Sequence, residues 1–544
     1  MASSSLNVKK RDAVFAAVLL AAVCLQIWKA SVGMGSADEH FYTTLGYRFM
    51  KGDALFFDDW HIAQMIAFFI EPLVKLYTSL TGGTGGIIRY MRYCYIVFTA
   101  LTGTVFYLRF RHSSSAAAAA CVYLLYTPLQ IMALSYNTMS AGFALLALCA
   151  YPVKEENRLR LFLTGIFAAF AVINTPYLVL IYPVLCIAAL RNAGWFSRRR
   201  WCWLSLGVLA AALLFVIYVG LHTGFSQVVQ GLPHLIDPSH SKGLYMIVRN
   251  VALLWRFFGI FAVLMAMEPF AAYYFRRRRK DRRELFLKAV LVINACAMLY
   301  VCFVSDYQTD LGSRGTVLFP FFMTGAVYLV LFGDRTFRSV FFAVSVFHSL
   351  MILSSSNVGP RSYCGPLVIA VMMTVLFLSD RRELHFWTAG VTAVLLGCLL
   401  FSKCTDVYMG NESYDVRIQE GPLAGLKDSA AAVQRYENGL ADMKELNGLE
   451  GDSAMLVTWE VWEYLALDKQ IATFSTYPYF WEEEEYVSAQ QAYAKLHPDR
   501  YPAWIYLDRE NAPYRMKPEN AFFAAMESRD PLREGFLFYG GEPR

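Results

Sequence analysis

The sequence is poor in charge. Only 17% of its 544 residues are Asp, Glu, Lys or Arg, whereas ordinary soluble domains carry about 25%. Hydrophobic residues make up 57% of the chain, in long runs, and the mean hydropathy is +0.38. This composition excludes a purely cytosolic enzyme and a disordered protein, and it predicts a polytopic membrane protein.

Motifs that indicate a disulfide framework, a metal site or a nucleotide site are also missing. The eleven cysteines lie almost all in apolar runs, and no CxxC pair or Cys/His ligand spacing occurs, which excludes a disulfide-stapled secreted scaffold. No GxGxxG or P-loop supports nucleotide binding, and nothing indicates a nucleic-acid partner. The N-terminal run from Lys9 to Trp28 resembles a signal peptide but lacks a small-residue cleavage pattern, so we expect an uncleaved first membrane helix.

Charge divides the chain into two domains. Residues 1–402 hold 35 Lys and Arg against 18 Asp and Glu, a balance of +17, whereas residues 403–544 hold 14 against 25, a balance of −11. We therefore predict a transmembrane domain over 1–402 and a soluble, acidic domain over 403–544. Short β-rich runs at Ala454–Trp459 and Ala503–Leu507, with a helical pattern at Val487–Leu496, predict an α/β fold for the second domain.

Seven basic clusters recur along the first domain and predict its topology. Cytoplasmic loops collect Lys and Arg, so all seven clusters should lie on one face. The apolar stretches between them each accommodate one out-and-back pair of spans. With a last span at about 386–402, this predicts thirteen transmembrane helices in a plasma membrane, a cytoplasmic N-terminus and an extracytoplasmic C-terminal domain. The clusters are Lys9–Arg11, Arg109/Arg111, Lys154/Arg158/Arg160, Arg191–Arg200, Arg276–Arg283, Arg335/Arg338 and Arg381/Arg382.

The first outer loop, about 30–86, is too polar to span the membrane. Within it, Ile62–Leu80 is amphipathic and is followed by the glycine-rich stretch Gly82–Gly86. This pattern is typical of a helix that lies in the membrane interface.

Acidic residues concentrate in this same loop, directly after the first span. Carboxylates near an apolar boundary have raised pKa values, which suits a general base, and a second acid can orient the first or bind a divalent cation. Capping of a helix by solvated polar residues is the alternative for each residue taken singly. The candidates are Asp38, Glu39, Asp58 and Asp59, with Trp60, His61 and Gln64 beside them.

Asp38-Glu39 followed by Asp58-Asp59-Trp60-His61 and Gln64 resembles the C-type glycosyltransferases (the GT-C fold), in particular the protein O-mannosyltransferases and lipid A aminoarabinose transferases. The resemblance implies an inverting transferase that takes a sugar from a polyprenyl phosphate and passes it to an extracytoplasmic acceptor, whether glycan, lipid or protein. It implies Asp38 as the base and Glu39 as its neighbour. Asp58 or Asp59 is then the second acid, and His61 contacts acceptor, phosphate or metal. Trp60 and Gln64 complete the substrate-binding motif. Asp59 stands where such families carry Glu.

A departing phosphate needs cations on the outer face. Candidates for this role are few: Arg314 first, then Arg361, Lys242 and Arg249, with Arg89 and Arg92 at the second span. Contact with lipid headgroups or an Asp partner is the alternative for each of them.

Two other functions fit a polytopic protein with a soluble tail. A transporter or flippase of lipid-linked intermediates places charges near the membrane centre and shows repeated halves, and neither pattern is visible here. A structural membrane protein leaves the acidic cluster unexplained. We therefore expect an enzyme, with a divalent cation as one option for its cofactor.

Overall fold

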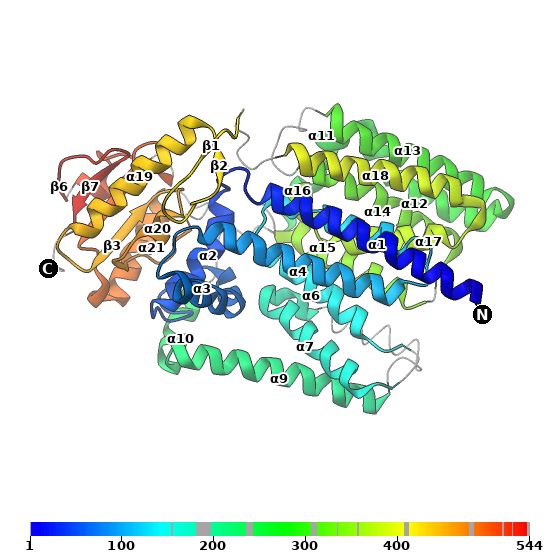
Figure 1. Ribbon diagram of the computed structural model, residues 1–544, viewed down its shortest axis with the longest axis horizontal. Helices are drawn as coiled ribbons and strands as arrows, with labels where there is room; N and C mark the ends of the chain where they lie inside the picture. The colour runs from blue at the N-terminus through cyan, green and yellow to red at the C-terminus, as the bar shows by residue number, and fades with distance from the viewer. Residues whose placement is uncertain are drawn as a thin grey trace.

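The protein consists of an elongated helical bundle joined end-on to a smaller region that contains a β-sheet (Figure 1). The computed structural model describes residues 2–153, 156–180, 197–235, 243–305, 313–334, 336–355, 358–406, 413–477, 483–513, 516–524 and 526–540. The N-terminus lies at the end of the bundle farthest from the sheet (Figure 1).

Within these residues, six helices are long and apolar enough to cross a membrane. They are α1 (Ala2–Lys29), α4 (Ile87–Phe110), α9 (Arg198–His222), α13 (Arg283–Phe303), α14 (Leu318–Phe332) with the 3-10 turn that leads into it from Arg314, and α18 (His385–Thr405). A seventh span can be formed by α11 (Gly243–Phe258) and α12 (Ile260–Arg278), which meet at 114° across Gly259. The remaining bundle helices are α5 (Ala116–Leu125), α6 (Tyr136–Ala150), α7 (Arg158–Asn174), α10 (Phe225–Gly231), α15 (Arg338–Ser355), α16 (Pro360–Tyr363) and α17 (Leu367–Ser379). The predicted count of thirteen spans is thus not confirmed.

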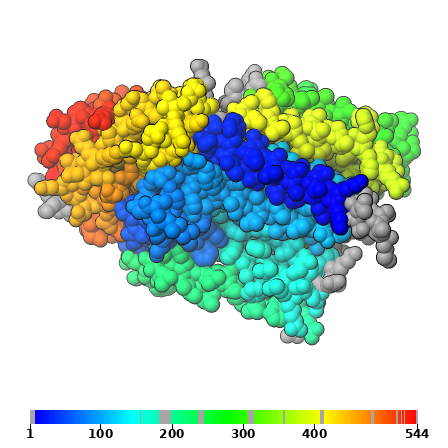
Figure 2. Space-filling view, viewed as in Figure 1, coloured from blue at the N-terminus to red at the C-terminus, as the bar shows by residue number. Residues whose placement is uncertain are grey.

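Apolar side chains on the outside of the bundle show which surface faces lipid. Leu209, Leu213 and Val216 of α9 are each at least 60% exposed. A surface of this kind is stable only against hydrocarbon. The protein is therefore a multi-pass membrane protein. In Figure 2, α1 runs across the near face between α4 and α18.

The described residues of the basic clusters gather at one end of the bundle. Arg11 Nη1 donates to the carbonyl of His112 over 2.8 Å, so the start of α1 meets the end of α4. Arg160 and Arg200, at the starts of α7 and α9, bond the carbonyls of Ala150 and Pro152 over 2.9 and 3.1 Å. The sheet lies at the opposite end (Figure 1). That the basic end is cytoplasmic stays a prediction.

The first outer segment is more helical than the sequence suggests. Asp38 and Glu39, which we expected on a loop, lie in the first turn of α2 (Ala37–Met50), because Ser36 caps that helix by accepting a hydrogen bond from the backbone N–H of Glu39. The predicted interfacial helix is confirmed as a helix. It forms η1 (Ile62–Ile66) and α3 (Ala67–Thr81), and it ends at Gly82, whose φ is +77°.

The C-terminal region is an α/β fold with both faces of its sheet covered. The strand order is β4 (Gln470–Ile471), β3 (Ser453–Val457), β5 (Trp504–Asp508), β7 (Gly535–Tyr539) and β6 (Glu527–Ser528). β3 is parallel to β4 and β5, while β7 is antiparallel to β5 and β6. The predicted strands are confirmed as β3 and β5, and the predicted helix lies within α21 (Glu483–Leu496).

Alternate residues of the sheet face two hydrophobic cores. Ala454 and Leu456 pack with α19 (Ala430–Gly448), whereas Met455 and Val457 pack with α21 and with Trp60 of the first outer segment. Two short helices, α20 (Glu463–Ala466) and α22 (Ala521–Ala524), complete the region. A hairpin of β1 (Val416–Arg417) and β2 (Lys427–Asp428) meets the chain after α1, where Val32 forms a bridge with Lys427.

Candidate active site

Asp38 lies at the seam between the bundle and the C-terminal region. Its carboxylate is half-buried in the first turn of α2, where the helix N-terminus favours negative charge. Oδ1 accepts a hydrogen bond from the hydroxyl of Tyr477, a residue of the C-terminal region. Burial raises the pKa of Asp38 above its usual range, and the Tyr477 hydrogen bond partly opposes that rise. A half-buried carboxylate with a raised pKa is suited to act as a general base.

Aromatic rings from three parts of the chain surround Tyr477, whose hydroxyl bonds Asp38. Tyr477 contacts Phe41, His61 and Trp459, with ring centroids 5.0, 5.8 and 5.8 Å away. Phe41 also contacts His61 in a tilted arrangement, with ring centroids 4.4 Å apart. The structure therefore brings predicted residues Asp38 and His61 to the same cluster. The imidazole of His61 also accepts a hydrogen bond at Nδ1 from the backbone N–H of Ala63, over 3.0 Å.

Glu39 is held by Arg92 of α4. Arg92 Nη2 lies 3.1 Å from Glu39 Oε2, and Nε bonds the other carboxylate oxygen. The same guanidinium donates to the carbonyls of Ala30 and Gly33, each over 3.0 Å. Both side chains are buried, so this pair fixes the connection between α1 and α2 and thereby the position of Asp38.

Asp58 and Asp59 belong to a buried ion network. Arg48, which is fully buried in α2, pairs with Asp59 over 2.9 Å and also with Asp53. Arg500 of the C-terminal region pairs with Asp53 over 2.7 Å and with Asp58 over 3.0 Å.

Burial raises the pKa of Asp58 and of Asp59 to about 6, and Asp53 adds to the rise at Asp58. His497 lies 3.3 Å from Asp58, and burial lowers its pKa to about 4. The network ties the first outer segment to the C-terminal region, so Asp58 and Asp59 can support the site by fixing this segment.

Trp60 and Gln64 hold the same segment in place. Trp60 is buried in the core of the C-terminal region, where its backbone N–H donates to the carbonyl of Phe474 over 2.8 Å and its indole N–H to that of Phe57 over 3.0 Å. Gln64 is fully buried, and its amide bonds the backbone of Phe56 and Asp59 over 2.6 and 2.8 Å.

The predicted phosphate-binding cations occupy different places. Arg314, in η7 (Ser313–Val317), pairs with Asp406 and donates to the carbonyl of Cys302 over 3.2 Å. Arg361 is half-buried in α16, and Arg249 is exposed on α11. Lys242 lies outside the described residues.

Sequence reasoning missed two buried lysines next to Arg314. Lys29, the last residue of α1, is 4% exposed and donates to the carbonyl of Asp406. Lys403, near the end of α18, is 1% exposed and donates to the hydroxyl of Thr127. Lys29 and Arg314 share Asp406 as their carboxylate neighbour, and Lys403 lies close to Lys29, so three cations and one carboxylate give a formal net charge of +2. In the described part of the chain, Lys403 has no carboxylate partner. A buried excess of positive charge is costly, so either an anion binds beside it or a lysine gives up its proton.

The segment beside these lysines is strained. Leu129 and Gln130 both adopt the left-handed conformation, with φ of +52° and +58°. Such residues cost on the order of 1–3 kcal/mol each and cluster at functional sites. Gln130 donates to Ser402 over 2.8 Å, and Ser402 in turn donates to Asp406 over 2.6 Å, so the strained segment shapes the wall of the cationic cluster.

Arg92 links this cationic cluster to Asp38. Its guanidinium bonds both the carbonyl of Ala30, which follows Lys29, and Glu39, which follows Asp38. The candidate base and the group of buried cations are therefore connected through Arg92. The sequence signal that could have found Lys29 and Lys403 is their position at the ends of the first and last spans, where positive charge is rare.

The acids do not fit a divalent cation. No group of three His, Cys, Asp or Glu side chains that could hold a metal occurs among the described residues. The carboxylates of Glu39, Asp53 and Asp59 are each engaged by an arginine. We therefore derive no step through a metal.

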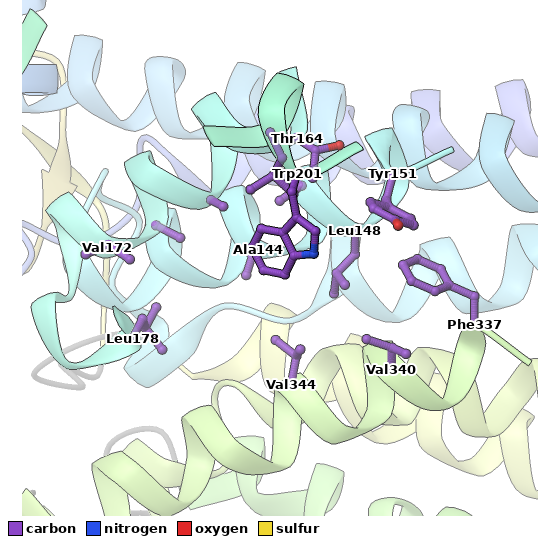
Figure 3. Close-up of a pocket in the computed structure, with 14 residues that line it drawn as sticks. Ala144, Leu148, Tyr151, Thr164, Val172, Leu178, Trp201, Phe337, Val340 and Val344 are labelled. Atoms are coloured by element: carbon purple, nitrogen blue, oxygen red, sulfur yellow. The ribbon is translucent and has the colours of Figure 1, made fainter. Parts of the chain in front are cut away.

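An apolar cavity of about 100 Å³ lies elsewhere, between α6, α7, α9 and α15 (Figure 3). Trp201, in the first turn of α9, points into it together with Leu148 and Val344. The last turn of α9 lies beside the outer segment, where His222 contacts Glu71. The cavity is thus toward the opposite end of the bundle from Asp38, and its walls carry no group suited to catalysis.

Two similar solved structures are crystal structures of ArnT from Cupriavidus metallidurans. The form bound to undecaprenyl phosphate is 12% identical, with a TM-score of 0.41, and the match covers 97% of this chain and 98% of that chain. The apo form is 13% identical, with a TM-score of 0.39, and the match covers 98% and 100%. No family model and no curated protein matches the chain. ArnT is a lipid A aminoarabinose transferase, one of the kinds of enzyme that the sequence resembles. Because identity and TM-score are low, we base the function on this chain's own residues.

Proposed function

We propose that the protein is a membrane glycosyltransferase that moves a sugar from a polyprenyl phosphate to an acceptor hydroxyl on the extracytoplasmic side. Asp38 is the general base. The cationic cluster of Lys29, Lys403 and Arg314 binds the donor phosphate. The observation that carries the proposal is this pairing of a half-buried carboxylate with a buried net positive charge, at the end of the bundle that the C-terminal region covers.

The chemistry follows from these two parts. The acceptor hydroxyl gives its proton to Asp38, and its oxygen forms a bond to the anomeric carbon. The bond from that carbon to the phosphate oxygen breaks on the opposite side, so the configuration inverts. The electron pair passes to polyprenyl phosphate, whose growing negative charge the cationic cluster stabilises.

The other predicted residues act through their neighbours. Glu39 positions Asp38 through Arg92, and Asp58, Asp59, Trp60 and Gln64 hold the segment that supports it. His61, next to Tyr477, is placed to contact the acceptor. The acceptor reaches Asp38 from the seam between the bundle and the C-terminal region.

The direct test is a transfer assay in proteoliposomes. Purified protein is supplied with undecaprenyl phosphate that carries a radiolabelled sugar, together with a cell-envelope acceptor fraction. We expect label to leave the lipid only when protein and acceptor are both present. Label that crosses the bilayer while still attached to the lipid would instead support the transporter alternative and contradict the proposal.

The phosphate site has its own test. Undecaprenyl phosphate binding to the purified protein is measured by native mass spectrometry for wild type, Lys29→Met/Lys403→Met and the exposed control Lys75→Met. Loss of two charge-assisted contacts should weaken binding by at least about tenfold in the double variant, with no change in the control. Equal binding by all three proteins would show that the cluster does not hold the phosphate.

A further inference from the structure

A polar pocket of about 460 Å³, separate from the apolar cavity, lies between the start of α4 and the β1–β2 hairpin. It is separate from Asp38 and takes no part in the proposed reaction. Two arginines and three tyrosines dominate its walls. They are Arg89 and Arg417, with Tyr77, Tyr90 and Tyr93.

The pocket is cationic without an internal counter-charge. No salt bridge involves Arg89 or Arg417 in the described part of the chain. Arg89 Nε donates to the hydroxyl of Tyr93 over 2.7 Å, and its guanidinium lies 5.5 Å from the centre of that ring. The neighbouring Glu420 pairs with Lys444 over 2.8 Å. Two positive charges and several phenol hydroxyls on a carboxylate-free wall favour an anion.

Glycines leave the space in which these groups sit. A Cβ added at Gly425, where φ is +87°, would lie 2.6 Å from Arg89 Nη1. One added at Gly86 would lie 3.2 Å from the Tyr77 hydroxyl. The glycine at 425 thus leaves room for the Arg89 guanidinium beside the hairpin, in a backbone conformation that favours glycine.

The pocket lies at a boundary between water and lipid. Arg89 is in the first turn of a candidate membrane span whose Val97 and Leu101 are 57% and 62% exposed. On α3, Leu76 and Leu80 are 52% and 78% exposed on either side of Tyr77. Apolar surface on both helices that form the pocket indicates that acyl chains pass beside it.

We propose that this pocket binds the phosphate headgroup of a negatively charged membrane lipid. Arg89 and Arg417 hold the phosphate, and the Tyr93 hydroxyl, which accepts from Arg89, donates a hydrogen bond to it. The acyl chains lie along α3 and α4. The lipid thereby anchors the β1–β2 hairpin, and with it the C-terminal region, to the membrane surface.

The test uses the full-length protein in detergent, with thermal unfolding as the readout. Dioleoyl phosphatidylglycerol should raise Tm in a saturable way, whereas dioleoyl phosphatidylcholine and inorganic phosphate should have little effect. Arg89→Gln and Arg417→Gln should each weaken the apparent phosphatidylglycerol affinity by about tenfold. The control Arg277→Gln removes the same single charge from an exposed position of α12 and should leave the shift unchanged.

Arg417 is exposed, so its variant should fold even if the Arg89 variant does not. Native mass spectrometry then counts one bound phosphatidylglycerol fewer in Arg417→Gln than in wild type. An unchanged lipid shift in both arginine variants would overturn the proposal. An equal rise in Tm with inorganic phosphate would show that the pocket binds free phosphate, and it would overturn the proposal of a lipid headgroup. Neither result bears on sugar transfer, which is measured separately.

Discussion

At the scale of single residues, Asp38 depends on one hydrogen bond from the other end of the chain. The Tyr477 hydroxyl stabilises the charged form of Asp38, so its removal should raise the pKa of that carboxyl further. Asp38 must be ionised to accept a proton, and activity is therefore lost as pH falls through this pKa. We predict that Tyr477→Phe moves the acid limb of the kcat/KM profile to higher pH, by about one unit.

This prediction is checked on the full pH profile rather than at one pH. Well above the acid limb, Tyr477→Phe should approach the wild-type rate, because Asp38 is then ionised in both proteins. A uniform loss of activity at every pH would mean that Tyr477 only supports the local structure.

Residue types alone single out Asp38 and His61 as candidate site residues, but they do not indicate which residues these two contact. An acidic pair directly after an apolar span indicates a boundary site. Tyr477 has no such signal, because it lies 439 positions away in a region with many tyrosines. Lys29 and Lys403 lie at the ends of apolar spans, where a lysine side chain usually extends to the membrane interface. Only the fold shows that Lys29 is buried against Asp406 and Lys403 against Thr127.

At the scale of elements, the end of α1, η7 and the end of α18 form the cationic cluster together. Arg314→Ala removes one cation and leaves Asp406 to neutralise Lys29. We predict that KM for the lipid donor rises by about tenfold or more, while KM for the acceptor changes little. Arg338→Ala is a matched control, because Arg338 pairs with Asp380 over 2.6 Å at the opposite end of the bundle. Equal rises in both KM values would argue against phosphate contact.

The elements with strong periodicity were predictable and the irregular ones were not. Ile62–Leu80 shows its helical pattern, and the strands at 454 and 503 show their β-rich runs. The left-handed Leu129 and Gln130 carry no signal, because glycine and asparagine are the usual residues in that conformation. The start of α2 reads as a polar loop, although Ser36 followed by two acids is also a helix N-terminus.

At the scale of the whole molecule, a buried network joins the two halves. Arg48 bonds Asp59 over 2.9 Å and also the carbonyl of Thr473, 425 positions further along the chain. Composition predicts the division into a membrane part and an acidic α/β region. It cannot predict this junction, because a pairing at such sequence separation leaves no local pattern.

We predict that Arg48→Met strongly destabilises the protein. The change leaves the carboxylates of Asp53 and Asp59 buried without the guanidinium that pairs with both. Breaking a buried pair in this way costs about 3–5 kcal/mol, so the thermal midpoint in detergent should fall clearly. Arg435→Met, at an exposed pair with Glu510, is the control and should have little effect. A wild-type midpoint for Arg48→Met would show that the network does not hold the halves together.

The central claim is that the Asp38 carboxylate takes the acceptor's proton. The most direct measurement is single-turnover transfer of labelled sugar from undecaprenyl phosphate by Asp38→Asn, with donor binding measured on the same preparation. The amide keeps the shape of the side chain but cannot act as a base. The account predicts wild-type donor binding with transfer lowered by about 100-fold or more. Transfer at the wild-type rate by Asp38→Asn would contradict it.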